Sequence, residues 1–192
     1  MGFLGPVGRD VTREFEEVVL VHLDALYRTA LRLTHNRAEA EDVVQETCLR
    51  AFRGFRRFEP GTNARAWAFT ILRHVFLNRL RRGGRETTEA DDFGLESALE
   101  SATYAPDAEN PEEHFLQTVL HGDIDRALRA LPVMFREAVI LTDLEGLTYK
   151  ETSDVLGCPI GTVMSRLYRA RQLLRQTLAR YARERGYIKE SG

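Results

Sequence analysis

The sequence predicts an all-α protein in which two small helical domains are joined by a flexible acidic linker. Apolar residues recur at three-to-four spacing in residues 15–76 and again in residues 160–174, which is the period of an amphipathic helix. The chain has 192 residues, of which 43% are hydrophobic, and this content is spread over both segments. The chain is therefore long and apolar enough to form two small helical cores.

Charge divides the chain into the same parts. Residues 1–85 carry 15 basic and 10 acidic residues, residues 86–125 carry 12 acidic and no basic residues, and residues 126–192 carry 12 basic and 7 acidic residues. A basic excess on a folded module favours contact with phosphates, because Arg and Lys release condensed counterions when they neutralise a nucleic-acid backbone. The excess is strongest between Arg50 and Arg85, where Glu59 is the one acidic residue.

The first module is expected to be helical throughout. Apolar residues recur from Phe15 to Leu33, and the periodicity lapses at His35. Asn36, with Glu39 three residues later, predicts the N-cap of a second long helix that continues through residue 52. An acidic patch on a basic module is a candidate protein-docking surface. The polar face of this helix carries Glu41, Asp42, Gln45, Glu46 and Arg50.

The loop at residues 59–63 contains turn-forming residues that end the preceding helix. It offers Thr62 or Asn63 as the N-cap of a third helix, which is expected to run over about residues 64–82 and to stop at a Gly pair.

One side of this third helix is apolar, and the other side combines cationic and hydrogen-bonding groups. Such groups beside Trp67 and Phe69 are suited to holding an unstacked single strand. The alternative is that both aromatic residues anchor the core and that only the arginines touch solvent. The polar sector contains Thr70, Arg73, His74, Asn78 and Arg81.

The segment that follows has low hydrophobicity and charge of a single sign, which is typical of a flexible linker. Pro111 marks its end, since Pro is favoured at the first position of a helix. We therefore expect a first domain at residues 1–85, a linker at residues 86–112 and a second domain at residues 113–192.

Residues 147–167 predict a helix-turn-helix, a unit whose second helix can enter a DNA major groove. Thr148, with Glu151 three residues later, predicts a helix N-cap, and Gly157 followed by Pro159 predicts the helix stop and the turn. The alternative is an Arg-rich, solvated terminal helix of an ordinary bundle.

The second helix of this unit is expected to begin at Gly161 or Thr162. A rotation of 100° per residue separates a packing face from an exposed face that is free to bind. The packing face contains Ile160, Val163, Leu167, Ala170 and Leu174, and the exposed face contains Met164, Ser165, Tyr168, Arg171 and Arg175.

Several other classes of protein are disfavoured. No apolar run approaches the roughly 20 residues of a membrane span, and the first residues lack the pattern of a signal peptide. Cys48 and Cys158 stand in different modules without a Cys-x-x-Cys pair, which favours a reducing cytoplasm, and Cys48 is expected to pack in the core.

A metal enzyme is the remaining catalytic alternative. It would use the four potential ligands between residues 113 and 125, which lack the His-x-x-x-His spacing of a zinc site. We therefore expect no catalytic residues, no metal and no cofactor. The four residues are Glu113, His114, His121 and Asp125.

Three runs, at residues 38–47, 58–67 and 159–167, together resemble an extracytoplasmic-function (ECF, group IV) sigma factor of bacterial RNA polymerase. The resemblance covers essentially the whole chain in the right order. It implies a dissociable initiation subunit with no catalytic chemistry of its own, built from a sigma2-like helical bundle and a sigma4-like helix-turn-helix domain. Residues 60–63 and 161–167 resemble the branch that serves thiol-oxidative stress.

The resemblance implies where the first domain makes contacts. The helix at residues 38–53 would dock on the clamp helices of the largest polymerase subunit through the polar face described above. The loop at residues 61–64 would capture a flipped base of the minus-ten element, and the helix behind it would hold the melted strand. The DNA-binding residues expected here are Thr62, Asn63, Arg65, Trp67, Arg73, His74, Asn78 and Arg81.

The resemblance also implies that the helix-turn-helix reads the minus-thirty-five element. Met164 cannot form the bidentate hydrogen bonds of a basic residue, so an apolar contact, for example with a thymine methyl, is what it can offer. Base readers would be Met164, Ser165, Tyr168 and Arg169, with Arg166 and Arg171 near phosphates.

The implied partners are promoter DNA, as duplex and as melted single strand, the core polymerase with its clamp helices and flap, and an anti-sigma factor. The acidic linker would act either as an RNA mimic in the polymerase cleft or as a plain tether. A stand-alone helix-turn-helix regulator is the alternative function, although it would not require the loop and basic helix at residues 59–82.

Overall fold

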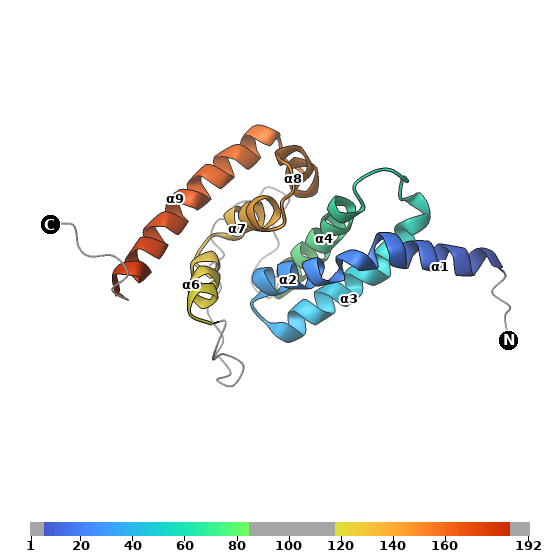
Figure 1. Cartoon of the computed structure of the whole chain (residues 1–192), viewed down its shortest axis with the longest axis horizontal. Helices are drawn as coiled ribbons and strands as arrows, with labels where there is room; N and C mark the ends of the chain where they lie inside the picture. Colours follow the sequence, from blue (N-terminus) through green and yellow to red (C-terminus); the bar gives the residue numbers. More distant parts are fainter. Residues whose placement is uncertain (1–5, 85–117, 185–192) are drawn as a thin grey trace. The chain divides into compact units, whose positions relative to one another are not determined.

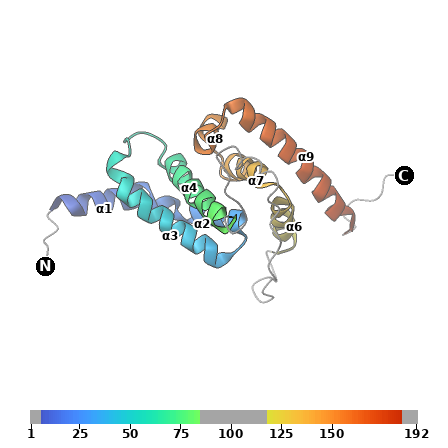
Figure 2. The ribbon, with the colours of Figure 1, turned by 180° about the vertical axis from the view of Figure 1, so that it is seen from behind.

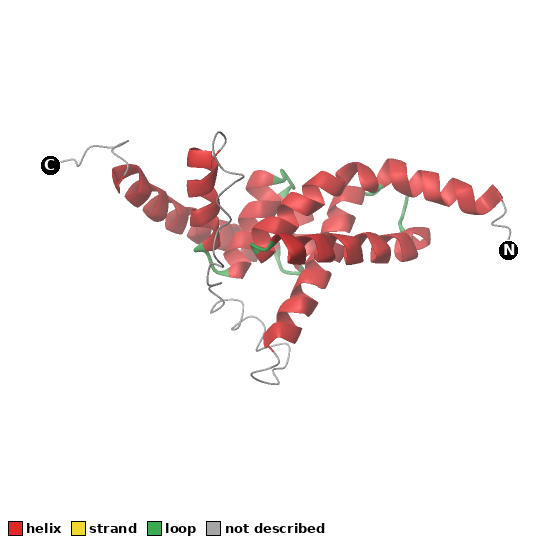
Figure 3. Ribbon diagram, turned by 90° about the horizontal axis from the view of Figure 1, so that it is seen from below, coloured by secondary structure: helices red, strands yellow, loops and turns green. Residues whose placement is uncertain are grey.

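The computed structural model describes residues 6–84 and 118–184. These residues form two compact units, the first made mainly by the helices before the gap and the second mainly by the helices after it (Figure 1). Every regular element in the described residues is helical (Figure 3), so the prediction of an all-α, two-domain fold is confirmed. The predicted linker at residues 86–112 lies outside the described residues.

The first unit is built around three helices that contact one another, α2, α3 and α4 (Figure 2). Its core contains Leu26 and Leu33 of α2, Val43 of α3, and Phe69 and Leu72 of α4, all buried. In chain order the elements are α1 (Pro6–Val18), the 3-10 turn η1 (Leu20–His22), α2 (Leu23–Thr34), α3 (Arg37–Gly54), the 3-10 turn η2 (Phe55–Arg57) and α4 (Ala64–Gly84).

The N-terminal periodicity gave no sign of the break between α1 and α2. The break falls in a cluster that includes Val18, Val19 and Val21, whose β-branched side chains lower helix propensity. Val19, four residues after the buried Phe15, is buried while Val21 is largely exposed, so the buried stripe of α1 continues to the start of the break. The next helix start is as predicted, because Asn36 Oδ1 accepts a hydrogen bond from the Glu39 N–H at 3.1 Å.

The second unit packs α6 and α7 against α9. The buried stripe of α9 contains Val163, Leu167 and Ala170, as the periodicity predicts. In chain order the elements after the gap are α6 (Thr118–Arg129), α7 (Val133–Val139), the π-helical turn η4 (Ile140–Leu144), α8 (Tyr149–Leu156) and α9 (Ile160–Glu184).

Arg136 of α7 is completely buried and holds the end of α6. Its guanidinium donates to the carbonyl oxygens of Leu128, Arg129 and Leu131 at 2.9–3.0 Å. These carbonyls belong to the last turn of α6 and the residues after it, where the donors of a continuing helix end, although the Leu128 carbonyl also accepts the Leu131 N–H at 3.1 Å. Burial lowers the pKa of Arg136 to about 10, so the side chain is still a cation at neutral pH.

Replacing Arg136 by Met should lower the free energy of unfolding of the second unit by about 3 kcal/mol, because the Arg129 and Leu131 carbonyls lose this donor and the Leu128 carbonyl keeps only the Leu131 N–H. Urea unfolding of the full chain, followed by far-UV circular dichroism, measures this change. Arg126→Gln, an exposed change on α6, is the matched control and should stay within about 0.5 kcal/mol. Equal stability of the two variants would show that Arg136 does not hold α6.

Candidate nucleic-acid interface

The helix-turn-helix made by α8 and α9 is formed as the capping pattern predicts. The Thr148 N–H donates to Glu151 Oε2 at 2.8 Å, and the Glu151 N–H donates to Thr148 Oγ1 at 3.2 Å. Gly157 adopts a φ of +61°, a left-handed conformation that ends α8. The Ser153 hydroxyl donates to the Cys158 carbonyl at 2.6 Å, which ties α8 to the turn.

The helix α9 begins at Ile160, one residue before the earliest predicted start. Ile160 was expected to pack, but it is exposed, because the helix begins before the stripe that contacts the rest of the unit. The side chains opposite the buried stripe are exposed and form what we call the reading face. The reading face consists of Met164, Ser165, Tyr168, Arg169 and Gln172.

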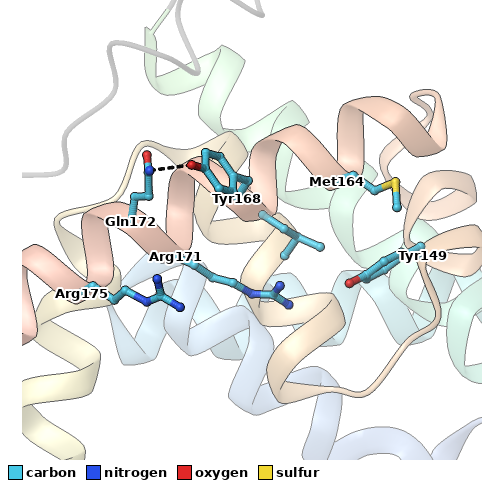
Figure 4. A pocket seen from close by; sticks show the side chains of 7 residues that line it. Tyr149, Met164, Tyr168, Arg171, Gln172 and Arg175 are labelled. Atoms are coloured by element: carbon cyan, nitrogen blue, oxygen red, sulfur yellow. Dashed lines mark hydrogen bonds between the residues drawn. The ribbon is translucent and has the colours of Figure 1, made fainter.

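Gln172 of the reading face was not singled out in the sequence. Its Nε2 donates to the Tyr168 hydroxyl at 2.9 Å, which fixes the orientation of the ring (Figure 4). The spacing of four residues from Tyr168 is the signal that places both side chains on one side of the helix.

Two arginines of α9 differ from the expectation that they face phosphates. Arg166 is only 7% exposed, and its Nη1 lies 3.9 Å from Cys158 Sγ, so its guanidinium is directed into the turn. Arg171 binds the Asp143 carboxylate in a bidentate manner, at 2.6 and 3.1 Å, which raises the pKa of Arg171. A phosphate contact by Arg166 would require its guanidinium to leave the turn, and Arg171 would have to exchange Asp143 for a phosphate, so the phosphate contacts of both residues stay predictions.

In the first unit, the loop before α4 is fastened at both ends. The Thr62 hydroxyl donates to the Glu59 carbonyl at 2.7 Å, and Asn63 Oδ1 accepts from the Ala66 N–H at 3.1 Å. Gly61 has a φ of +89°, which side chains rarely tolerate. Thr62 and Asn63 are exposed, so Asn63 is confirmed as the N-cap and both residues stand in an ordered, solvent-facing turn.

Aromatic residues on both sides of this loop in the sequence pack against one another. The Trp67 ring is half-buried, with its centroid 5.1 Å from that of Phe58 and 6.5 Å from that of Phe55. Phe69 is buried, and the Arg65 guanidinium lies over its ring at 5.6 Å. Phe69 is therefore a core anchor, whereas Trp67 both packs and retains exposed surface.

The polar sector of α4 is accessible along its length. His74 and Arg81 are exposed, and Arg73 and Asn78 are half-buried. Burial, and then the positive charge of Arg73 and neighbouring arginines, lowers the pKa of His74, so that its imidazole is neutral at pH 7. A neutral imidazole among arginines can both donate and accept hydrogen bonds.

The polar face of α3 is largely exposed and contains ion pairs. Asp42 lies 3.2 Å from Arg79 of α4, and Glu46 Oε1 lies 2.6 Å from Arg50, which lowers the pKa of Glu46. The exposed side chains on this face are Glu41, Asp42, Gln45 and Arg50, with Glu46 half-buried.

Leu49 lies on the same face of α3, and the sequence reading missed it. It is 46% exposed, four residues after Gln45 and seven after Asp42, a spacing that places all three on one side of the helix. Cys48, which was expected to pack in the core, is only half-buried, and this burial raises the pKa of its thiol.

Among the described residues, no group of His, Cys, Asp and Glu is placed to hold a metal ion. Glu113 and His114 of the alternative metal site lie outside the described residues. No helix in the described ranges is long and apolar enough to cross a bilayer.

Comparison with known proteins finds matches to both units. The Sigma-70 region 2 family matches residues 18–86, and the Sigma-70, region 4 family matches residues 121–174. The chain is 40% identical to the ECF RNA polymerase sigma factor SigE of Mycolicibacterium smegmatis over 88% of its own length, although it spans only 63% of that relative. It is 30% identical to the RNA polymerase sigma-H factor of Pseudomonas aeruginosa over 93% of each chain.

A solved structure has a similar fold. The sigma factor RpoE of Bartonella quintana, in complex with the anti-sigma factor NepR, matches 87% of this chain and 98% of its own, with 34% identity and a TM-score of 0.71.

Replacing Asn63 by Ala should lower the free energy of unfolding by about 1 kcal/mol, because the Ala66 N–H loses its capping acceptor. Asn63→Asp keeps an acceptor at the same place and should stay within about 0.5 kcal/mol of the parent. Urea unfolding of the full-length variants compares the two. If Ala is as stable as Asp at this position, the cap contributes nothing.

Proposed function

The chain belongs to the ECF RNA polymerase sigma factors, and from this premise we propose that it binds the core polymerase and directs transcription initiation at a specific set of promoters. The observation that carries the proposal is the presence of two exposed, arginine-bearing helix faces, on α4 and on α9, in two compact units of one chain. One face is suited to melted DNA and the other to duplex DNA.

In this proposal residues 1–85 contact the core enzyme and the minus-ten element, residues 113–192 read the minus-thirty-five element, and residues 86–112 link them. The ordered turn with exposed Thr62 and Asn63 supports base capture, because an unpaired base can be read on its edges. The strand behind it would follow Arg65, Trp67, Arg73, His74, Asn78 and Arg81.

The duplex element would be read by Met164, Ser165, Tyr168 and Arg169, which are all exposed on α9. Core docking would use the exposed face of α3, now with Leu49 among its residues. An apolar side chain inside a charged surface is typical of the centre of a protein interface.

The proposal extends to regulation. The RpoE of Bartonella quintana was solved with an anti-sigma factor, and we propose that an anti-sigma factor also controls this chain, in the cytoplasm and as part of a stress response. The narrower assignment to thiol-oxidative stress is supported by the sequence of residues 60–63 and 161–167.

Run-off transcription from a genomic promoter library tests the function directly. Core polymerase free of any sigma factor is assayed with and without the full chain. Initiation at a discrete set of promoters that depends on the chain supports the proposal. Duplex binding without initiation would contradict it and would instead identify a stand-alone helix-turn-helix regulator.

Replacing Leu49 by Ala should weaken binding to the core polymerase about tenfold, because an exposed leucine in the docking face loses its contacts with the partner. The free energy of unfolding of the Leu49→Ala variant should hardly change, since about half of the Leu49 side chain is already exposed to solvent. Competition against the parent chain for core enzyme measures the affinity. Leu31→Ala on α2, at a 37% exposed leucine, is the matched control and should bind normally.

A further inference from the structure

Two contacts define how α3 and α4 lie against each other (Figure 2). Asp42 Oδ2 of α3 lies 3.2 Å from Arg79 Nη1 of α4. A Cβ at Gly54 of α3 would lie 3.8 Å from Trp67 Cζ2 of α4. Residue numbers rise on α3 and fall on α4 from the first contact to the second, by the same amount on each helix. The two helices are therefore antiparallel over this stretch.

Arg50 lies on the side of α3 that borders α4. It stands one turn before Gly54, which faces α4, and a rotation of 100° per residue turns it away from the exposed Leu49 of the docking face. In the antiparallel register it lies opposite the turn of α4 that contains His74. Burial, then the charge of Arg73, and then the charge of Arg50 lower the pKa of His74, which agrees with this placement.

A carboxylate holds Arg50 at this border. Glu46 Oε1 accepts a hydrogen bond from Arg50 Nε at 2.6 Å, and both side chains keep exposed surface, 35% and 42% respectively. The hydrogen bond from Arg50, and then the charges of Arg50, Arg53 and Arg79, lower the pKa of Glu46. With Asp42, which pairs with Arg79, the border holds three cations and two carboxylates, a net charge of +1 that a further anion can balance.

A phosphate of a single strand is the anion that fits this border. The polar sector of α4, which is suited to a melted strand, reaches the border at His74, so a strand held there passes beside Arg50. Arg50 uses Nε for Glu46, so its Nη groups can donate to a phosphate oxygen while the ion pair persists. A guanidinium suits the docking face less well, because the acidic residues of that face favour a basic partner.

We propose that Arg50 is a strand-binding residue, which donates hydrogen bonds to one phosphate of the melted promoter strand where that strand passes from α4 onto α3. This inference rests on the proposed function. It moves Arg50 from the docking face of α3, where the sequence placed it, to the strand-holding surface of the first unit. The contact adds affinity for the strand and reads no base, because a phosphate is the same at every nucleotide.

The experiment uses holoenzyme assembled from the full chain and core polymerase, on a promoter selected in the transcription assay. Single methylphosphonate linkages, which lack the negative charge of a phosphate, replace each linkage of the melted strand in turn. At least one replacement should weaken binding about threefold to tenfold with the parent chain and have no effect with Arg50→Gln. The slope of log affinity against log salt concentration should also fall by about 0.7 with Arg50→Gln.

Arg28→Gln is the matched control, because Arg28 is an exposed arginine of α2 outside the proposed contact surfaces. This variant should keep the full methylphosphonate penalty. Competition for core enzyme separates the two roles of Arg50. If Arg50→Gln weakens core binding and keeps every methylphosphonate penalty of the parent chain, Arg50 belongs to the docking face and the inference is overturned. Failure to select any promoter would overturn both the inference and the proposed function.

Discussion

The buried stripe of α9 determines what the second unit can present to a ligand. Val163, Leu167 and Ala170 are almost completely buried, and both α6 and α7 pack on the helix that carries them. Because successive residues of a helix rotate by 100°, burial of this stripe places Met164 and Tyr168 in solvent. Arg136 fixes the end of α6 within the same unit. The position of the reading face therefore depends on packing among residues that are not part of that face.

Features that depend on neighbouring residues were predictable from the sequence. The caps at Asn36, Asn63 and Thr148 satisfy backbone groups three residues away, so a short motif contains all the information needed. The break between α1 and α2 was not predictable in this way. Neither Gly nor Pro marks it, and the β-branched residues there lower helix propensity only slightly, which is too weak a signal to place a 3-10 turn.

The arginines show the same limit within the candidate interface. The sequence presents Arg136, Arg166, Arg169 and Arg171 as equal positive charges, yet the structure buries the first two and pairs the last with Asp143. The partners that decide these roles are carbonyls and a carboxylate on other elements, up to 28 residues away. The exposure of Leu49 on α3 could not be predicted for a related reason. The helical period shows which residues share a side of the helix, but it does not show where the buried side ends and the exposed side begins.

Ion pairs within the candidate interface also affect how much each arginine would contribute to the proposed contacts with DNA and polymerase. Arg50, Arg79 and Arg171 each lie beside a carboxylate, and all three arginines retain exposed surface. Exposed pairs of this kind contribute little to stability, so a phosphate can replace the carboxylate at small cost. A paired arginine nevertheless gains less from a phosphate than a solvated one, because the contact it loses offsets part of the gain. In the proposed interface, sequence-independent affinity would thereby be reduced, and a larger share of DNA binding would fall to contacts that differ between bases, such as those proposed for Met164 and Tyr168.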